Sequence, residues 1–445
     1  MIPPDGVGRP RAACGERAVS ATLGTVRDGC SWSAGRGGNG GEMAGGYTFV
    51  DLFCGAGGLS AGFIQAGFTP LLAVDDSVAA VDTYSRNLGA HALCADLARN
   101  VSLPDASVVV GGPPCQGFSS AGLRVSGDER NTLVRRFAEI VVSLRPAAFV
   151  FENVEGFLTG DDGRRVLELL LPLIEAGYRV HLQKVNAANY GVPQHRKRVI
   201  AVGGLGWDPS LPPPTHSAHG APGARLVSRT LPPAPNVADA FRGLPAPAGA
   251  EPGHPTDHYA RLLDGVDLER ARSLMQGQTM RDLPQELWHV SYRRRAFRRV
   301  MDGTPTERRG GAPAGVRRLR LDEPSKAITG GARSEFLHPV EDRYLTLREC
   351  ARLQTFDDGF AFAGTTAERA QLIGNAVPPR LALAIARCLA ADLAVARTAT
   401  REGALLSFIP TLSAGMSPKL AQTAEAVGLL TSLSKSGARQ LPLWA

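Results

Sequence analysis

The sequence lacks several features that define common classes of protein. Its seven cysteines include no CxxC pair and no Cys/His cluster with the spacing of metal ligands, which argues against a zinc site and against a disulfide framework. The N-terminus has no apolar core of signal-peptide length, and the most apolar late stretch, residues 381–396, contains Arg387 and Asp392. We therefore expect a protein of the reducing cytoplasm, without a metal ion or a membrane span.

Lysine is also scarce. Only five of the 49 basic residues are lysines, so the net charge of +7 comes almost wholly from arginine. Arginine binds phosphate and guanine through paired hydrogen bonds, so this balance favours a nucleic-acid partner. A coding sequence biased towards Ala, Gly, Pro and Arg would give the same composition, so charge alone leaves both explanations open.

The length of 445 residues predicts two domains with additional tails. Residues 1–45 are rich in Gly, Arg and Ser and bury too little apolar surface to fold, so we expect a disordered arm. An RNA-binding arm is the alternative. Met43 lies directly before the first structured segment, and a translation start at that residue is a further alternative.

Residues 46–204 alternate β-branched runs with helical stretches. The predicted strands cover 47–53, 70–75, 107–112, 147–153 and 198–204. One predicted helix begins at Leu59, and three others cover 77–87, 131–144 and 163–176. This order predicts an α/β fold, in which a Rossmann-like, doubly wound and mostly parallel sheet is covered by helices on both faces. Ligands of such folds bind at the carboxyl ends of the strands.

The rest of the chain changes character twice. Residues 205–316 combine prolines with arginine-rich pieces such as "SYRRRAFRRV" (291–300), which predicts a smaller, irregular, basic domain. Residues 317–398, with a helix over 379–395, return to the first domain. Residues 399–445 form a tail of unknown role that contains one weakly amphipathic stretch, 418–430.

A glycine-rich turn follows the first strand, in "FVDLFCGAGGLSAGF" (49–63), and Asp75 ends the next strand 20 residues after Gly55. Glycines let backbone amides approach a ligand at a helix start, and a carboxylate at the second strand end accepts hydrogen bonds from ribose hydroxyls. NAD, FAD and S-adenosylmethionine sites share this pattern, and a turn used only for packing is the alternative. Asp96 ends a third strand, where it could bind an adenine amino group or cap a helix.

Three further motifs lie at predicted strand ends. "GGPPCQGFS" (111–119) holds Cys115 in a loop stiffened by prolines, where a thiol is placed for covalent catalysis or is an inert core cysteine. "FVFENVEGF" (149–157) places Glu152 at the same sheet edge, where a protonated carboxyl could donate to a ring nitrogen. "QHRKR" (194–198) sends Arg196 and Arg198 to one face. Taken separately, Glu152 and the two arginines also fit surface ion pairs.

These motifs, in this order and together with "QLIGNAVPP" (371–379), make the chain similar to the DNA (cytosine-5)-methyltransferases from about Tyr47 to Ala396. "PPPTHS", "LDEPSKAITGG" and "LTLRECARLQTF" add to the resemblance. Two departures are the parts outside it, 1–42 and 400–445, and Asp357, where members of the family often carry proline.

The resemblance implies a role for each matching residue. Cys115, Glu152 and Arg196 would be catalytic. The S-adenosylmethionine site would contain Phe53, Gly55, Gly57, Gly58, Leu59, Asp75, Asp76, Asp96, Leu97, Pro113, Asn375 and Ala376. Asn375 would lie near the methionine end of the cofactor or brace Cys115. The residues at the DNA would be Pro114, Gln116, Ser119, Asn153, Gln194 and Arg198.

The implied chemistry starts with addition of Cys115 to C6 of a cytosine that has been extruded from duplex DNA. Glu152 would protonate or hydrogen-bond N3, Arg196 would hold the base, and C5 would take the methyl group. Residues 205–316 would recognise the DNA sequence, with "SYRRRAFRRV" facing phosphates or forming a solvated helix face. We expect a monomer that is nucleoid-associated when bound to DNA and that is either an orphan methylase or the partner of a restriction endonuclease acting at the same site without direct contact.

Three rival functions remain. An NAD-dependent oxidoreductase explains the glycine turn and Asp75 but leaves Cys115, Glu152 and the arginine pair without a role. The same architecture acting on tRNA is a second rival, against which the arginine-rich insert favours duplex DNA. A protein that only binds DNA is the third, and the filled catalytic positions disfavour it.

Overall fold

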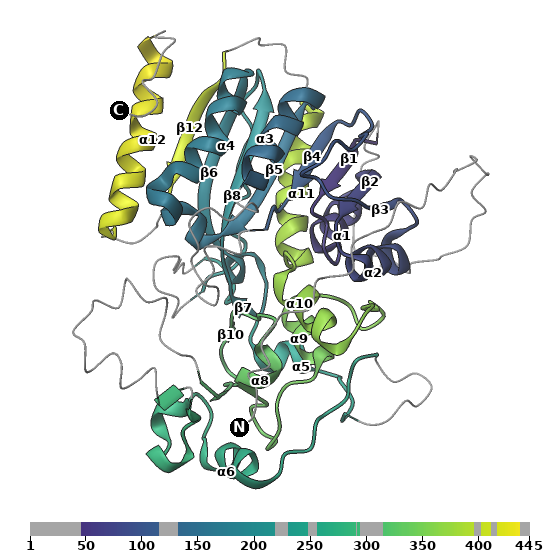
Figure 1. Ribbon diagram of the computed structural model, residues 1–445, viewed down its shortest axis with the longest axis vertical. Helices are drawn as coiled ribbons and strands as arrows, with labels where there is room; N and C mark the ends of the chain where they lie inside the picture. Colours follow the sequence, from purple (N-terminus) through teal and green to yellow (C-terminus); the bar gives the residue numbers. More distant parts are fainter. Residues whose placement is uncertain are drawn as a thin grey trace, which may run out of the picture.

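The computed structural model describes residues 46–114, 132–218, 230–247, 256–290, 292–293, 315–395, 402–410 and 416–436. The main element is an eight-stranded sheet with the order β12-β6-β8-β5-β4-β1-β2-β3 (Figure 1). Its strands are β1 (Thr48–Leu52), β2 (Thr69–Asp75), β3 (Ala92–Cys94), β4 (Val108–Gly111), β5 (Ala148–Val154), β6 (Tyr178–Asn186), β8 (Lys197–Leu205) and β12 (Ala404–Ile409). Only β8 runs antiparallel to its neighbours in this sheet, so the prediction of a mostly parallel α/β sheet is confirmed.

Helices cover both faces of the sheet, as the alternation of strands and helices predicted (Figure 1). Along β1, Phe49 belongs to one apolar core and Val50 to the other, because successive side chains of a strand point to opposite faces. The core of Phe49 includes side chains of α1 (Gly58–Gln65) and α11 (Pro379–Ala394), and the core of Val50 includes side chains of α3 (Thr132–Leu144) and α4 (Arg164–Glu175). The predicted helices are therefore confirmed, with α2 (Val78–Leu88) completing the set.

The stretch Thr366–Ala394, which comprises α10 (Thr366–Asn375) and α11, is long and apolar enough to cross a membrane by length and composition alone. In the fold, 61% of its most apolar window is buried inside the protein. Such burial is typical of a core helix of a folded domain, which can match a membrane span in length and apolar composition.

The region 205–316 contains only short elements in its described parts. These are α5 (Val237–Phe241), α6 (Gly265–Ser273), η4 (Met280–Asp282) and η5 (Gln285–Leu287). In Figure 1, α6 lies at the end of the molecule farthest from α3 and α4. A small apolar core that includes Ala271, Met280 and Leu337 packs this region against the chain that follows it. Most of "SYRRRAFRRV" lies outside the described residues.

Short elements of the returning chain lie between the sheet and the α6 region. They are β9 (Arg317–Arg318), β10 (Ser325–Lys326), α8 (Ala332–Glu335), β11 (Phe336–Leu337) and α9 (Leu347–Leu353), and β10 pairs with β7 (Gln194–His195). Arg318 connects α6 to the returning chain, because its buried guanidinium donates to Ala271 O at 2.5 Å and to His338 O at 2.8 Å.

Two strands of the sheet were missed in the sequence. β6 intersperses Arg179, His181, Gln183 and Lys184 among its apolar residues, so it carries no continuous apolar run. β12 belongs to the segment 399–445, and it pairs in parallel with β6 at the sheet edge. The helix α12 (Pro418–Ser436), which contains the weakly amphipathic stretch, packs beside β12 (Figure 1). Among the described cysteines, Cys54, Cys350 and Cys388 are free.

Candidate active site

The glycine turn after β1 is sharply bent and has open space beside it. Phe53, Gly55 and Gly57 have φ values of 60°, 53° and 83°, so the chain bends sharply through left-handed conformations before α1 begins. Asp75, at the end of the neighbouring strand β2, accepts a hydrogen bond from Gly55 N at 2.9 Å. A Cβ at Gly55 would meet no atom within 4 Å, so open space lies beside the turn.

A second glycine brings a distant segment against this turn. A Cβ at Gly58 would lie 2.1 Å from Val377 O, so only glycine permits this approach of the segment between α10 and α11. The segment carries Asn375, which accepts a hydrogen bond from Gln371, and the buried Ala376. The turn and the "GNAVPP" motif, more than 300 residues apart in the sequence, therefore lie in direct contact.

The other predicted cofactor residues occupy the same edge of the sheet with different exposure. Leu59 and Leu97 are buried in the apolar cores. Asp96 follows β3, and its Oδ1 accepts a hydrogen bond from Ala98 N at 2.9 Å. This bond closes a turn, and no helix begins there, so Asp96 does not act as a helix cap. Its half-exposed side chain leaves the other oxygen near Arg99, 3.8 Å away. Asp76 follows Asp75 at the end of β2.

Glu152 lies near the carboxyl end of β5, with only 7% of its surface exposed. Burial raises the pKa of its carboxyl above the usual value, and the neighbouring Arg198 and Arg196 partly oppose this rise. Arg198 Nε lies 2.6 Å from Glu152 Oε1. The loop after β4 also passes close, because a Cβ at Gly112 would lie 3.1 Å from Glu152 Oε2.

Asn153 connects the Glu152 strand to the proline loop. Its side-chain amide donates to Pro113 O at 3.2 Å, and its own oxygen accepts from Val154 N at 2.9 Å. Pro113 is buried and Pro114 half-buried at the end of the described part of this loop. Cys115, Gln116 and Ser119 lie outside the described residues, and their predicted roles stay predictions.

Two residues of "QHRKR" have surroundings that differ from the expectation. Arg196 is 1% exposed, and its guanidinium donates to Ile328 O at 2.7 Å, Gly374 O at 2.7 Å and Ala376 O at 3.0 Å. Gln194 is fully buried and bonds Leu353 O and the side chain of Gln354, both at 2.7 Å. Gln194 therefore packs inside the protein in this structure, and its predicted DNA contact stays a prediction. The Arg196 guanidinium braces the segment before α11 and also lies close enough to Glu152 to lower the pKa of its carboxyl.

Sequence reasoning assigned Arg198 to DNA and missed its contact with Glu152. The contact arises because β8 runs antiparallel to β5, with Arg198 opposite Val154 and Ile200 opposite Glu152. It also missed Glu155, whose carboxylate pairs with the buried Lys184 at 2.9 Å and with Lys197 at 3.6 Å. The order of the motifs could not reveal these pairs, because strand direction decides them.

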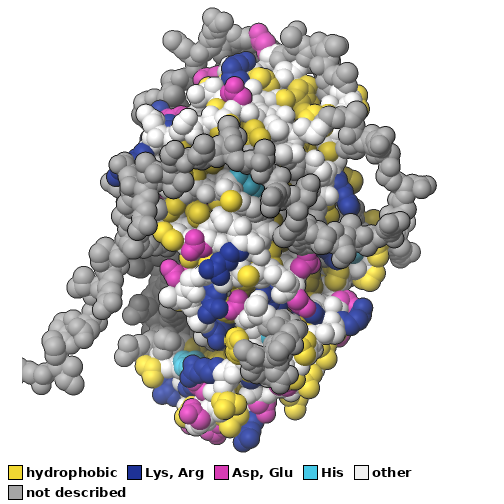
Figure 2. All heavy atoms as spheres, turned by 90° about the vertical axis from the view of Figure 1, so that its right-hand side faces the viewer, with side chains coloured by type: hydrophobic (Ala, Val, Ile, Leu, Met, Phe, Trp, Pro, Cys, Tyr) yellow, Lys and Arg dark blue, Asp and Glu magenta, His cyan; other side chains and the backbone are white. Residues whose placement is uncertain are grey.

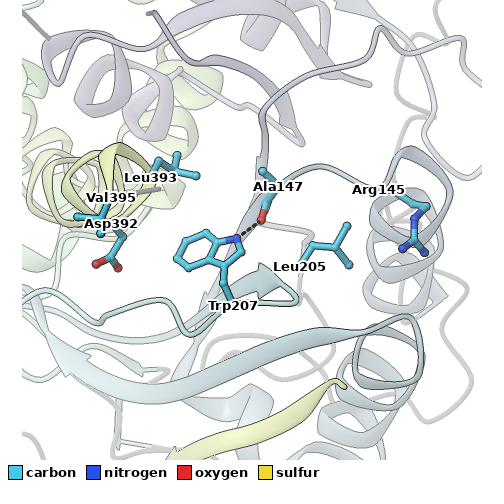
Figure 3. Close-up of a pocket in the computed structure, with 7 residues that line it drawn as sticks. All are labelled: Arg145, Ala147, Leu205, Trp207, Asp392, Leu393 and Val395. Carbon is cyan, nitrogen blue, oxygen red and sulfur yellow. Dashed lines mark hydrogen bonds between the residues drawn. The ribbon is translucent and has the colours of Figure 1, made fainter. Parts of the chain in front are cut away.

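A cavity of about 440 Å³ lies at the opposite edge of the sheet (Figure 3). Its lining includes Ala147, which precedes β5, Leu205, which ends β8, and Trp207, whose indole donates to Ala147 O at 3.0 Å. Glu152 lies towards the other end of β5, so this cavity is distinct from the candidate active site. Among the described residues, no group of three or more His, Cys, Asp and Glu side chains could hold a metal ion.

The sheet, its helices and the glycine turn define an α/β protein with a class I methyltransferase fold. The family model for C-5 cytosine-specific DNA methylases matches residues 47–391. The chain therefore belongs to this family, and it is a DNA cytosine-5 methyltransferase.

Several curated proteins and solved structures are similar to the chain. The Type II methyltransferase M1.HphI of Haemophilus parahaemolyticus is 33% identical over 355 residues, which cover 77% of this chain and 86% of that protein. M.AgeI of Thalassovita gelatinovora is 32% identical, covering 76% of this chain and 98% of that protein. A crystal structure described as a prophage-encoded DNA modification methyltransferase from E. coli has a TM-score of 0.58 and 24% identity, covers 78% of this chain and 99% of that one, and supports the fold.

Proposed function

We propose that this enzyme transfers the methyl group of S-adenosylmethionine to C5 of a cytosine extruded from duplex DNA, through a covalent bond between Cys115 and C6. The observation that carries the proposal is the joint placement, at one sheet edge, of the open glycine turn with Asp75 and the buried Glu152 beside the loop that leads to Cys115. The glycine turn and Asp75 fit a nucleoside cofactor. Glu152 and the loop that leads to Cys115 fit a pyrimidine.

The residues around the turn fit S-adenosylmethionine. Asp75 would accept hydrogen bonds from the ribose, and the open space beside Gly55 would admit the cofactor without a clash. Asn375 and Ala376, held against the turn by Val377, would line the methionine end. When bound, the cofactor supplies an electrophilic methyl group on a sulfonium.

The chain's own groups would activate the cytosine. The Cys115 thiolate would form a bond to C6, while Glu152, whose raised pKa favours the protonated form, would donate to N3. The added electron density would make C5 nucleophilic enough to bond to the methyl carbon as the bond of that carbon to the sulfonium sulfur breaks, with the electron pair left on sulfur. Loss of the C5 proton and elimination of the Cys115 sulfur from C6 would then restore the aromatic ring and free the thiolate.

We propose that residues 205–316 read the DNA sequence. On the face shown in Figure 2, Lys and Arg side chains are spread over the lower half of the molecule, interspersed with acidic and apolar ones. Such a mixed basic surface suits phosphate contacts for position and a few side chains for base edges. Because M1.HphI and M.AgeI are Type II methyltransferases, we propose that the enzyme modifies DNA as part of a restriction-modification system or as an orphan.

The test compares the wild type with Cys115→Ala on duplex DNA and labelled cofactor. We expect the variant to lose methyl transfer while it retains binding of both DNA and S-adenosylmethionine. The wild type should form a denaturant-stable adduct with 5-fluorocytosine DNA, because the fluorine blocks loss of a C5 proton. Full turnover by Cys115→Ala would contradict the assignment of Cys115 as the nucleophile. Methyl transfer to tRNA but not to DNA would contradict the assignment of DNA as the substrate.

A further inference from the structure

The segment 402–436 lies beyond the region matched by the family model, which ends at residue 391. In its described parts, residues 402–410 and 416–436, β12 extends the main sheet and α12 packs beside it (Figure 1). β12 pairs with β6 from Ala404 opposite Arg179 to Ile409 opposite Gln183. Leu405, Leu420 and Val427 are buried in the same apolar core as Phe151 and Phe157, so the segment contributes to the core next to the Glu152 strand.

The element that α12 covers is an unusual one. Directly after β5, the chain forms a nine-residue 3-10 helix, η2 (Glu155–Gly163). Runs of 3-10 helix longer than about four residues are uncommon because their hydrogen-bond geometry is poor. Asp161 adds a left-handed residue near its end, with φ 47°. An element with such weak internal hydrogen bonding needs tertiary contacts to keep one conformation.

α12 supplies these contacts. Thr423 is fully buried on α12, and its hydroxyl donates to Leu158 O, in the middle of η2, at 2.8 Å. Lys419 O, one turn earlier on α12, is a second acceptor for the same proton at the longer distance of 3.1 Å. The last residue of η2, Gly163, has φ 88°, and a Cβ there would lie 2.7 Å from Thr423 Oγ1 and 3.0 Å from Thr423 Cα. The end of η2 is therefore pressed against the backbone of α12 at Thr423.

The beginning of η2 is joined to the candidate active site. Glu155, its first residue, follows Glu152 by three positions and pairs with the buried Lys184 at 2.9 Å. The Phe157 ring packs against the Phe151 ring, with 5.2 Å between the centroids, and Phe151 precedes Glu152 on β5. A displacement of η2 would therefore move the end of β5, where the Glu152 carboxyl and the Asn153 amide are held.

We propose that α12 is a positioning element for Glu152, and that Thr423 is the positioning residue that fixes η2 through Leu158. This inference rests on the proposed role of Glu152 in methyl transfer. It assigns a catalytic contribution to residues 402–436, which do not touch the glycine turn or Glu152 in the described contacts. The hydroxyl of Thr423, rather than its bulk, carries the interaction.

The experiment uses the full-length chain and two substitutions at one position. Thr423→Val removes the hydroxyl and keeps the shape, whereas Thr423→Ser keeps the hydroxyl. We expect kcat of Thr423→Val, per S-adenosylmethionine-binding site, to fall about fivefold, the effect of one lost hydrogen bond, with KM for DNA and Kd for the cofactor nearly unchanged. Thr423→Ser should retain the wild-type kcat.

Two results would overturn the inference. One is a Thr423→Val variant whose Tm is lowered while its kcat is unchanged. This result would show that the hydroxyl stabilises the fold without positioning Glu152. The other is an equal fall of kcat in both variants. Should Thr423→Val not fold, Gly163→Ala perturbs the same contact from η2, and unchanged kcat there would also contradict the inference. Wild-type protein without methyl transfer would instead refute the proposed function, which separates the two failures.

Discussion

Arg198 and Glu152 form an ion pair with 2.6 Å between Arg198 Nε and Glu152 Oε1. The two residues come from neighbouring antiparallel strands and are diagonal neighbours on one face of the sheet. Both side chains are largely buried, so solvent ions screen their attraction only weakly. Arg198 lowers the pKa of Glu152, while burial raises it by more. The protonation of Glu152 therefore depends on Arg198, a residue of β8.

Replacing Arg198 should impair catalysis and move its pH dependence. In Arg198→Gln, the pKa of Glu152 rises further because an opposing positive charge is lost, although Arg196 still faces the carboxyl. We expect kcat to fall about tenfold or more as Glu152 loses its orientation, and the alkaline limb of the kcat profile to move to higher pH. Arg198→Lys keeps the charge and should shift the limb less. Identical pH profiles in the wild type and Arg198→Gln would contradict this account.

Asp51 should make stability depend on pH. Its buried carboxyl accepts a hydrogen bond from Ser60 Oγ at 2.6 Å, and burial, with Asp75 nearby, raises its pKa from 3.8 to about 7. The folded state therefore holds a proton that the unfolded chain releases. This stabilising contribution is complete below pH 3.8 and is lost as the pH rises through about 7.

Asp51→Asn should remove that dependence, because the amide stays neutral at every pH and can still accept from Ser60. We expect the variant to gain about 2 to 4 kcal/mol relative to the wild type between acidic and mildly alkaline pH. Denaturant unfolding of both proteins across this range measures the difference. A constant offset between the two proteins would show that Asp51 does not titrate in the folded state.

Loss of Arg196 should weaken both the fold and the cofactor site. Arg196→Met removes the guanidinium that donates to the buried carbonyl groups of Ile328, Gly374 and Ala376, of which Ala376 O keeps a longer bond from Gln354 at 3.4 Å. We expect unfolding to become easier by about 3 to 5 kcal/mol. S-adenosylmethionine should bind more weakly, since Asn375 lies between two of these carbonyls. Arg135→Met, at an exposed arginine of α3, is the matched control and should change neither quantity.

Gly58→Ala tests the close approach of the two cofactor segments. The added methyl would lie 2.1 Å from Val377 O, so either the turn or the segment before α11 must move. We expect a loss of about 1 to 3 kcal/mol in stability and weaker cofactor binding. Gly359→Ala, where a Cβ meets nothing within 4 Å, is the control. Isothermal titration measures the binding of S-adenosylmethionine. Wild-type affinity in Gly58→Ala would contradict a role of this contact in cofactor binding.

Exchange of residues 205–316 for the same region of a relative should transfer sequence specificity. The small core containing Ala271 and Met280 packs against Leu337 and Tyr344 of the returning chain, so the exchanged region must keep those contacts to fold. Bisulfite sequencing of DNA from cells that express the chimera would identify the methylated sites. Sites identical to those of the parent enzyme would place recognition outside this region.

Local patterns predicted the elements whose signals are local. The run "VVVG" of β4 is buried on both faces, and its continuous apolar character marks a central parallel strand. The 3.6-residue periodicity of α4 was equally visible, with Val166, Leu169, Leu170 and Leu173 on its buried side. β6 escaped detection because alternating polar residues hide a strand that lies near the sheet edge.

The site was predictable to a similar extent. The glycine turn, Asp75 and Glu152 were found because each follows a recognisable strand, and strand ends of a parallel sheet share one edge. Arg196 and Gln194 were placed at the substrate because their motif was recognised but their partners were not. Those partners, such as Gly374 and Leu353, are more than 150 residues away in the sequence.

The sequence alone determined that this chain forms an α/β sheet with a nucleoside-type turn, and it specified the chemical groups at the strand ends, because periodicity and motif order are local properties. Tertiary structure decided that Arg198 pairs with Glu152, that Arg196 is a buried brace, and that 402–436 joins the catalytic layer. These contacts depend on strand direction and on close packing between distant segments, which no local pattern of residues encodes.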